Sequence, residues 1–238
     1  SGVHGLGEPG VARHAQHDFL AGDDALRLAD LHAAFADADV RAVFCLRGGW
    51  GSPRLLPQID TALLRAHVKP FIGYSDITAL HALLQREGLI SFHAPMPASD
   101  LVIEGAEDDA AALFALLMNP LPAGRVFAPP LLPGAWHVAG TATGRLVGGN
   151  LSLLAALAGT PWALDARGAV LFIEDVSEAL YRVDRLLTQL RHTGLLDAAA
   201  GFLLGSFTED ADPTAVLREH LAGLGKPVLA GWPAGHGR

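Results

Sequence analysis

Short apolar runs that lead directly into helical patterns are the feature that most limits how this chain can fold. Residues 41–46 and 69–73 are runs of this kind, and each is followed by a short linking segment and a stretch with helical spacing of its apolar residues. Strands that alternate with helices in this way are typical of a parallel sheet with helices packed on it. The first half of the sequence therefore predicts a layered α/β domain with parallel strands.

The helices of this first half are predicted by apolar residues that recur every three or four positions. They cover residues 19–37, 55–66 and 76–87, and residues 47–52 form a glycine-rich loop after the first strand. Asp23 and Asp24 stand where the N-terminus of a helix favours acidic residues. We expect these side chains to fix the start of the first helix.

A stretch rich in proline and glycine separates the two halves of the chain. Regular structure is not expected in it, because proline interrupts helices and strands alike. We therefore expect an N-terminal domain over 1–118, a linker over 119–140 and a C-terminal domain over 141–238. In the C-terminal domain, the patterns predict strands over 143–147, 169–173, 202–205 and 227–230, a turn over 148–150, and helices over 151–158 and 178–193.

The composition excludes several classes of partner. Half of the 238 residues are hydrophobic, enough for a large core, and the formal net charge is −8. Binding to nucleic acid needs a basic face that neutralises phosphates, so we expect no nucleic acid partner. No apolar run reaches the ~20 residues of a membrane helix and no signal peptide opens the chain, which predicts no membrane contact and a cytoplasmic location. The single cysteine, Cys45, lies in an apolar run and is interpreted as a buried core thiol.

Ser75 is the strongest candidate for chemistry, because it stands between an apolar strand that ends at Gly73 and a helix that begins at Asp76. A serine in such a turn is raised clear of the sheet, and the N–H groups of the helix N-terminus can stabilise an oxyanion. The segment lacks the second glycine of a G-x-S-x-G motif, however, and serine is also a common helix cap. The pattern alone leaves both interpretations open.

A serine nucleophile needs a histidine base and an acid that orients it. Of the eleven histidines, His93 and His236 lie in segments that follow predicted strands, where catalytic residues are common. Eight of the others fit ordinary surface or helix-face positions: His14, His17, His32, His67, His81, His137, His192 and His220. Glu174 ends a buried strand, where α/β folds place site residues, although a structural acid fits that position as well. Glu178 is spaced to pair with Arg182 on one helix face.

The motifs predict no metal and no cofactor. His14 and His17 share one face of a possible helical turn, but no H-E-x-x-H motif and no Cys/His set accompanies them. The loop Arg47-Gly48-Gly49-Trp50-Gly51 lacks both the Gly-Lys-Ser/Thr of a phosphate-binding loop and the spacing of a dinucleotide motif. We interpret its glycines as positions where the backbone approaches Ser75 and supplies an oxyanion donor.

Taken together, these motifs resemble the LD-carboxypeptidases, or muramoyltetrapeptide carboxypeptidases, and their relatives that confer self-immunity to peptide-nucleotide antibiotics. The matching segments span most of the chain in the family's order, so the series is far more specific than any single motif. They are 20–24, 47–52, 73–80, 92–96, 148–154, 174–178, 181–185 and 235–236.

The resemblance implies a serine, glutamate and histidine triad that is carried here by Ser75, Glu174 and His236. The oxyanion hole would consist of the backbone N–H of Asp76 and an N–H of the loop Gly48-Gly49. It also implies an α/β N-terminal domain, a smaller β-rich C-terminal domain, a homodimer and no cofactor.

The activity that the resemblance implies is removal of the terminal D-alanine from a muropeptide tetrapeptide, by cleavage of an L,D-peptide bond in peptidoglycan recycling. Arg47 and Trp50 are the candidate substrate-binding residues. Trp50 stands where the family usually has tyrosine, and Ala94 where it usually has glycine. Members of the family also continue beyond their Gly-His motif, so we expect the C-terminal domain of this chain, over 141–238, to be truncated.

Two other functions are left open by the sequence. The first is a different serine acyl hydrolase that uses the same Ser75, either an esterase or a self-immunity amidase. The second is a module without catalytic activity that binds a small ligand at the strand ends.

Overall fold

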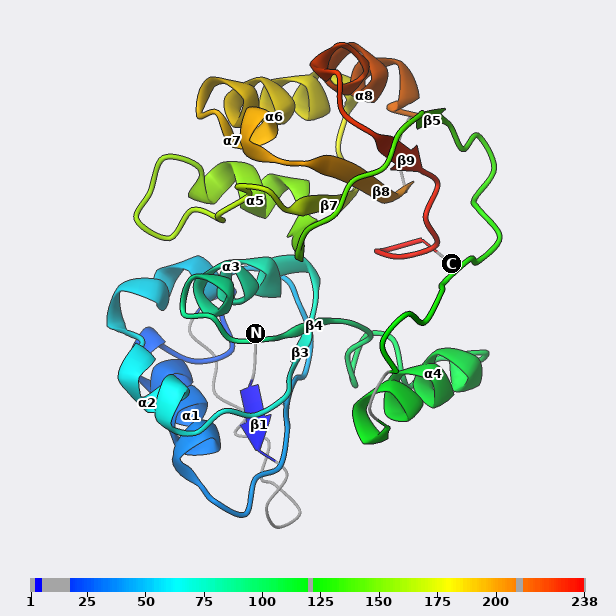
Figure 1. Ribbon diagram of the computed structural model, residues 1–238. Coiled ribbons are helices and arrows are strands. Elements are labelled where there is room, and N and C mark those ends of the chain that lie inside the picture. Colours follow the sequence, from blue (N-terminus) through cyan, green and yellow to red (C-terminus); the bar gives the residue numbers. More distant parts are fainter. Residues whose placement is uncertain (1–2, 6–17, 120–121, 209–211, 238) are drawn as a thin grey trace. The chain divides into compact units, whose positions relative to one another are not determined.

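The chain folds into two compact units, Ser1–Val126 and Phe127–Arg238, and the division falls within the stretch rich in proline and glycine. The computed structural model describes residues 3–5, 18–119, 122–208 and 212–237, so His14 and His17 lie outside the described residues. Each unit contains one sheet with helices packed against it (Figure 1). The predicted α/β class with parallel strands is confirmed.

The first unit contains a four-stranded sheet in the order β1–β2–β3–β4, in which β2, β3 and β4 are parallel and β1 is antiparallel to β2. The strands are β1 (Val3–Gly5), β2 (Val43–Cys45), β3 (Phe71–Gly73) and β4 (Phe92–His93). The helices are α1 (Asp24–Ala36), α2 (Thr61–Ala66), α3 (Thr78–Arg86) and α4 (Glu107–Met118), with the 3-10 turns η1 (Ser52–Arg54), η2 (Leu56–Gln58) and η3 (Ser75–Ile77). Within this unit, α1 contacts β1 and α2, while α3 contacts β4.

The helix starts of the first unit follow its aspartates. Asp23 caps α1 by accepting a hydrogen bond from the Leu26 N–H at 2.8 Å, as its position predicts. The single helix predicted over 55–66 is wrong, since η1 and η2 occupy part of the segment and only α2 is an α-helix. Pro57 lacks an N–H, and Asp60 accepts a hydrogen bond from the Leu63 N–H at 3.0 Å, so a new helix begins after Asp60.

The second unit contains a five-stranded sheet in the order β5–β9–β8–β7–β6, in which only β5 is antiparallel to its neighbour. The strands are β5 (His137–Val138), β6 (Leu146–Asn150), β7 (Val170–Val176), β8 (Gly201–Thr208) and β9 (Val228–Ala230). The helices are α5 (Leu151–Leu157), α6 (Leu180–His192), α7 (Leu195–Ala198) and α8 (Thr214–Leu221), followed by the 3-10 turn η4 (Ala222–Leu224). Because α5 contacts α6, and α6 contacts α7 and α8, these helices form a continuous layer (Figure 1).

The turn predicted over 148–150 is wrong, because β6 continues through both glycines to Asn150. Gly148 pairs with Phe172 of the parallel strand β7, and a Cβ at Gly148 would lie 1.9 Å from the Phe172 carbonyl oxygen. The glycine is therefore needed for close approach of two strands, not for a turn. The prediction that the stretch 119–140 is irregular is also wrong in part, because the stretch contains β5, which pairs with β9.

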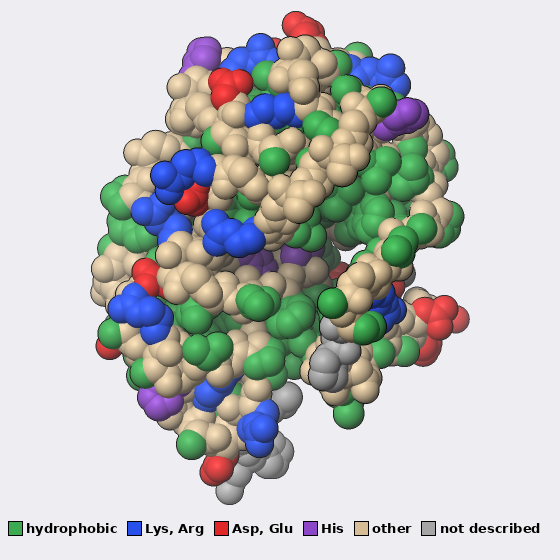
Figure 2. All heavy atoms as spheres, viewed as in Figure 1, with side chains coloured by type: hydrophobic (Ala, Val, Ile, Leu, Met, Phe, Trp, Pro, Cys, Tyr) green, Lys and Arg blue, Asp and Glu red, His purple; other side chains and the backbone are tan. Residues whose placement is uncertain are grey.

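Both units have buried apolar cores. Cys45 is completely buried on β2, which confirms its interpretation as a core thiol, and burial raises the pKa of this thiol far above its usual range. Hydrophobic side chains also reach the surface, where Figure 2 shows them in green between the charged side chains. Within the described part of the chain, no helix combines the length and the apolar character needed to cross a membrane.

Candidate active site

Both units place the candidate residues at the carboxyl ends of their parallel strands, which is where α/β folds carry their sites. In the first unit, the loop that contains Gly48 follows β2, and Ser75 follows β3. In the second unit, Glu174 lies near the end of β7, and His236 follows β9.

Ser75 occupies a sharp turn directly after β3. Its φ angle is 63°, in the left-handed region that non-glycine residues adopt at a cost of roughly 1–2 kcal/mol. From Phe71 to Leu84, every residue except Ser75 is buried, so packing on both sides holds the strained turn in place. The turn therefore leads the chain from strand to helix while only the serine remains accessible, as in a nucleophile elbow.

Gly48 lies against this serine. A Cβ at Gly48 would be 2.9 Å from the Ser75 Cβ and 3.1 Å from the Ser75 Oγ, which is closer than side chains normally pack. The loop is anchored through Asp76, whose buried carboxylate accepts a hydrogen bond from the Ser52 N–H at 2.8 Å. Burial raises the pKa of Asp76. The sequence indicates a part only for the backbone N–H of Asp76, whereas in the structure its side chain also holds the glycine loop.

His81 of α3 contacts the end of β3, directly before the same turn. Its Nε2 lies 2.8 Å from the Gly73 carbonyl oxygen and its Nδ1 lies 2.8 Å from the Ser91 Oγ. Burial lowers the pKa of His81 to about 4, so the ring is neutral near pH 7. Because a carbonyl oxygen only accepts, Nε2 carries the proton and Nδ1 accepts from the Ser91 hydroxyl. The sequence predicts a surface or a helix-face position for His81. The side chain lies on α3 and is buried, so the helix-face position is confirmed and the surface position is wrong.

His93, the second histidine candidate, is half-buried at the end of β4. Its ring centroid lies 5.5 Å from that of Tyr74 and 6.3 Å from that of His81, so the imidazole packs among other rings. The Tyr74 hydroxyl donates a hydrogen bond to Asp100 at 2.7 Å. These contacts indicate a structural part for His93 in the first unit.

Glu174 and His236 lie in direct contact, although 62 residues separate them in the sequence. The His236 Nδ1 is 2.6 Å from the Glu174 Oε2, and the same oxygen accepts the His236 backbone N–H at 3.2 Å. Glu174 is completely buried. With Nδ1 donating to the carboxylate, Nε2 is the nitrogen that can take up a proton, which is the arrangement of a general base and its orienting acid.

The neighbouring acids make other contacts. Glu178 forms the predicted ion pair with Arg182 and also accepts a hydrogen bond from the Ser152 Oγ at 2.9 Å. Asp175 accepts hydrogen bonds from the Asn150 side chain at 2.6 Å and from the Ser152 N–H at 3.0 Å. Burial raises the pKa of Asp175. Of the three acids at the end of β7, Glu174 is the one that contacts His236.

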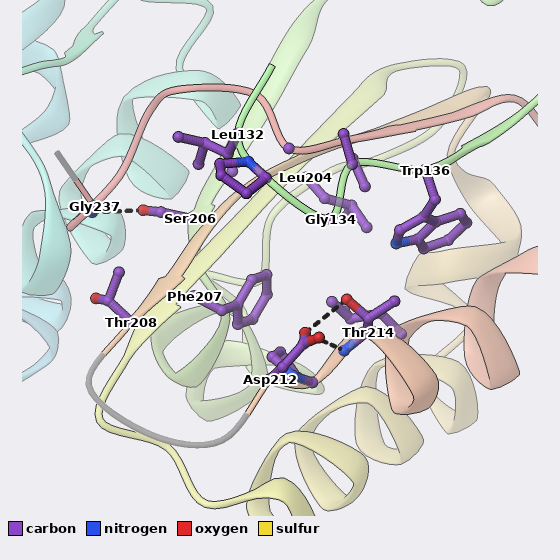
Figure 3. A pocket seen from close by; sticks show the side chains of 17 residues that line it. Leu132, Gly134, Trp136, Leu204, Ser206, Phe207, Thr208, Asp212, Thr214 and Gly237 are labelled. Atoms are coloured by element: carbon purple, nitrogen blue, oxygen red, sulfur yellow. Dashed lines mark hydrogen bonds between the residues drawn. The ribbon is translucent and has the colours of Figure 1, made fainter.

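Ser206 of β8 is a polar neighbour of this pair that the sequence analysis missed. Its hydroxyl accepts a hydrogen bond from the Gly237 N–H at 2.6 Å, and Figure 3 shows the two groups facing each other. Both residues line a cavity of about 270 Å³, whose wall also includes Trp136, Phe207 and Asp212. A lone serine inside a strand gives no signal in the sequence.

The remaining candidates lie in the glycine loop of the first unit. Gly48 is buried, whereas Gly49, Arg47 and Trp50 are exposed, with Trp50 retaining 47% of its accessible surface. The side chains of Arg47 and Trp50 are thus accessible for binding. Among the described residues, no group of three or more His, Cys, Asp and Glu side chains is arranged to hold a metal ion.

Comparison with known proteins gives matches over nearly the whole chain. Residues 3–94 match the LD-carboxypeptidase N-terminal domain, and residues 143–238 match the LD-carboxypeptidase C-terminal domain. The probable murein peptide carboxypeptidase of Bacillus subtilis (strain 168) is 42% identical over 236 residues, which cover 95% of this chain and 73% of that protein.

Two solved structures agree with these matches. Muramoyltetrapeptide carboxypeptidase from Oxalobacter formigenes superposes with a TM-score of 0.78 at 32% identity, covering 92% of this chain and 76% of that one. The microcin C7 self immunity protein in complex with aspartyl sulfamoyl adenosine gives a TM-score of 0.83 at 25% identity, with coverages of 95% and 77%. The fold, the order of the motifs and these matches agree, and the chain belongs to the LD-carboxypeptidase family.

Proposed function

We propose that this protein is a serine carboxypeptidase that releases a terminal D-alanine from muropeptide tetrapeptides by cleaving an L,D-peptide bond. The contact between Glu174 and His236 carries the proposal, because a buried carboxylate bound to a histidine Nδ1 is the relay that a serine nucleophile needs. The strained turn at Ser75 supports it from the first unit. The names of the relatives supply the substrate class.

In the proposed reaction, the Ser75 hydroxyl attacks the carbonyl carbon of the scissile bond, and His236 Nε2 takes up its proton. The oxyanion that forms accepts hydrogen bonds from the N–H of Asp76 and from an N–H of the loop Gly48-Gly49. His236 then gives the proton to the amine of the leaving D-alanine, and an acyl-enzyme remains. Water, deprotonated by the same imidazole, hydrolyses the acyl-enzyme, while Glu174 stabilises the imidazolium.

Substrate binding in this proposal involves the exposed side chains of the glycine loop. A guanidinium pairs well with a carboxylate, so Arg47 is the proposed partner of the terminal carboxylate, and Trp50 offers an exposed apolar face. The homodimer and the cytoplasmic location stay predictions. Sedimentation of the purified protein tests the first, and fractionation of cells tests the second.

The decisive experiment is an assay of D-alanine release from a murein tetrapeptide, comparing wild type with Ser75→Ala. We expect Ser75→Ala to lose several orders of magnitude in kcat while it still folds, because only binding and the oxyanion hole remain. Ser99→Ala, which removes an exposed hydroxyl from the same unit, serves as the control. A serine-directed phosphonate should label wild type and not Ser75→Ala. Wild-type turnover by Ser75→Ala would contradict the proposal.

A further inference from the structure

We propose that Ser206 is a positioning residue for His236, whose backbone its hydroxyl fixes so that the imidazole keeps its contact with Glu174. This inference rests on the proposed function, in which His236 is the general base. Ser206 is 3% exposed and lies near the carboxyl end of β8, on the strand that pairs with the one bearing Glu174. Three features of the second unit carry the argument.

The first feature is a bulge between β7 and β8. Ile173 pairs with Leu204, but Asp175 pairs with Phe207, so two residues of β8, Gly205 and Ser206, lie opposite the single residue Glu174. In a regular ladder Ser206 would pair with Asp175, and its side chain would point to the face away from Glu174. The extra residue turns Ser206 toward the face of Glu174. Bulges beside active sites often redirect a side chain in this way.

The second feature is the set of hydrogen bonds between Ser206 and the loop on both sides of His236. The Ser206 Oγ accepts from the Gly237 N–H at 2.6 Å and donates to the Ala234 carbonyl at 3.3 Å, and the Ser206 N–H donates to the same carbonyl at 2.9 Å. A hydroxyl has one donor and two acceptor positions, so it can make both of its bonds at once. Glu174 thus holds the ring of His236, and Ser206 holds the chain before and after it.

The third feature is the closeness of the loop to these two side chains. A Cβ at Gly235 would lie 2.7 Å from the Glu174 Oε2 and 2.8 Å from the Ser206 Oγ. A Cβ at Gly237 would lie 2.5 Å from the Ser206 Cβ, and Figure 3 shows the Ser206 side chain directed at Gly237. The glycines on either side of His236 therefore let the backbone rest directly on Ser206.

Ser206→Ala tests the inference, because it removes the hydroxyl but keeps the backbone hydrogen bond to Ala234. We expect kcat for D-alanine release to fall by about 10- to 100-fold with KM changed less than about twofold, since a misplaced base weakens catalysis more than binding. We also expect the Gly237 amide to lose its protection from hydrogen exchange. Ser206→Thr, which keeps the hydroxyl, should restore both.

Thr208→Val is the matched control. It removes a hydroxyl two residues along the same strand, and that hydroxyl is buried without a hydrogen bond to any described residue. We expect it to keep the kcat of wild type and the protection of Gly237. Equal losses of kcat in Thr208→Val and Ser206→Ala would overturn the inference, because both would then report general damage to β8.

His236→Ala, assayed in parallel, separates the two possible failures. An inactive His236→Ala beside a fully active Ser206→Ala would overturn the positioning role alone. A fully active His236→Ala would end the proposed function and the positioning role with it. Loss of hydrogen-exchange protection throughout β8 in Ser206→Ala, not only at Gly237, would also overturn the inference.

Discussion

The two units hold their parts of the proposed site in different ways. In the first unit, backbone geometry and packing hold Ser75 in place. Ser75 is strained between buried residues, and Gly48 leaves room for it. In the second unit, hydrogen bonds between side chains and a loop join β7, β8 and the segment after β9. The proposed nucleophile is thus set by local structure, whereas the proposed relay depends on residues that only the fold brings together.

This difference predicts different sensitivities. A turn held by close packing responds to added volume, because interiors have few voids larger than a water molecule. A relay held by hydrogen bonds responds to the loss or reversal of one polar group, which leaves a buried partner unsatisfied. One substitution that reverses a polar group, one substitution that adds volume and one change of pH test this difference.

The largest effect is expected from Glu174→Gln in the second unit. The amide keeps the size of the carboxylate but removes the charge, and its NH2 group offers a donor where the His236 Nδ1–H needs an acceptor. The histidine is then held in the wrong tautomer or turned away. We expect kcat for D-alanine release to fall by about 10⁴-fold, with KM and melting temperature nearly unchanged.

Glu178→Gln is the matched control for Glu174→Gln. Glu178 pairs with the exposed Arg182 four residues along the chain and accepts a hydrogen bond from the Ser152 hydroxyl, whereas the oxygen bound to His236 belongs to Glu174. We expect turnover close to that of wild type. An inactive Glu178→Gln beside an active Glu174→Gln would mean that the wrong carboxylate has been assigned to the relay.

Gly48→Ala tests the close packing of the first unit. Its new methyl group would lie 2.9 Å from the Ser75 Cβ, so either the serine or the loop must move. We expect kcat to fall by about 100-fold, because displacements of about 1 Å have effects of this size. Gly223→Ala is the control, since a Cβ there meets nothing within 4 Å. Normal turnover by Gly48→Ala would show that the contact between the loop and Ser75 is not needed.

The same contrast explains what was predictable from the sequence. The turn at Ser75 was found because its signal is local: an apolar strand, a serine and a helix start lie within a few residues. Ser206 was not found, because its bulge exists only through pairing with β7. The need for glycine at position 148 is also non-local, because it comes from the nearness of Phe172 on β7, and the local sequence resembles a turn. The helix α4 was not predicted, although acidic residues mark its first turn.

The relay pair shows the limit of inference from the residues alone. The position of Glu174 at a strand end fitted a structural acid as well as a catalytic one, and His93 fitted the base as well as His236 did. No spacing in the sequence indicates that residues 174 and 236 meet. Family resemblance supplied that pairing, and the structure brings the two side chains together in the second unit.

The remaining expected effect is on stability and not on turnover, and it is a pH dependence that belongs to the first unit. Burial lowers the pKa of His81 to about 4, from an ordinary value near 6.5, because the enclosed ring loses the solvation of its charged form, and the hydrogen bond to the Gly73 carbonyl offsets only part of this effect. Above pH 6.5 the ring is neutral in both the folded and the unfolded chain, so its contribution to stability is fully present. As the pH falls from 6.5 to 4, only the unfolded chain takes up the proton. The free energy of unfolding should therefore fall by about 3 kcal/mol over this window, and His81 should contribute no further loss below it.

His81→Gln, which keeps an N–H donor for the Gly73 carbonyl but does not titrate, should lack this part of the dependence. Urea unfolding of both proteins at several values between pH 4 and 7.5 gives the difference directly. Two parallel curves would mean that the folded protein protonates His81 as readily as the unfolded chain does, and that the turn at Ser75 does not rest on a neutral imidazole.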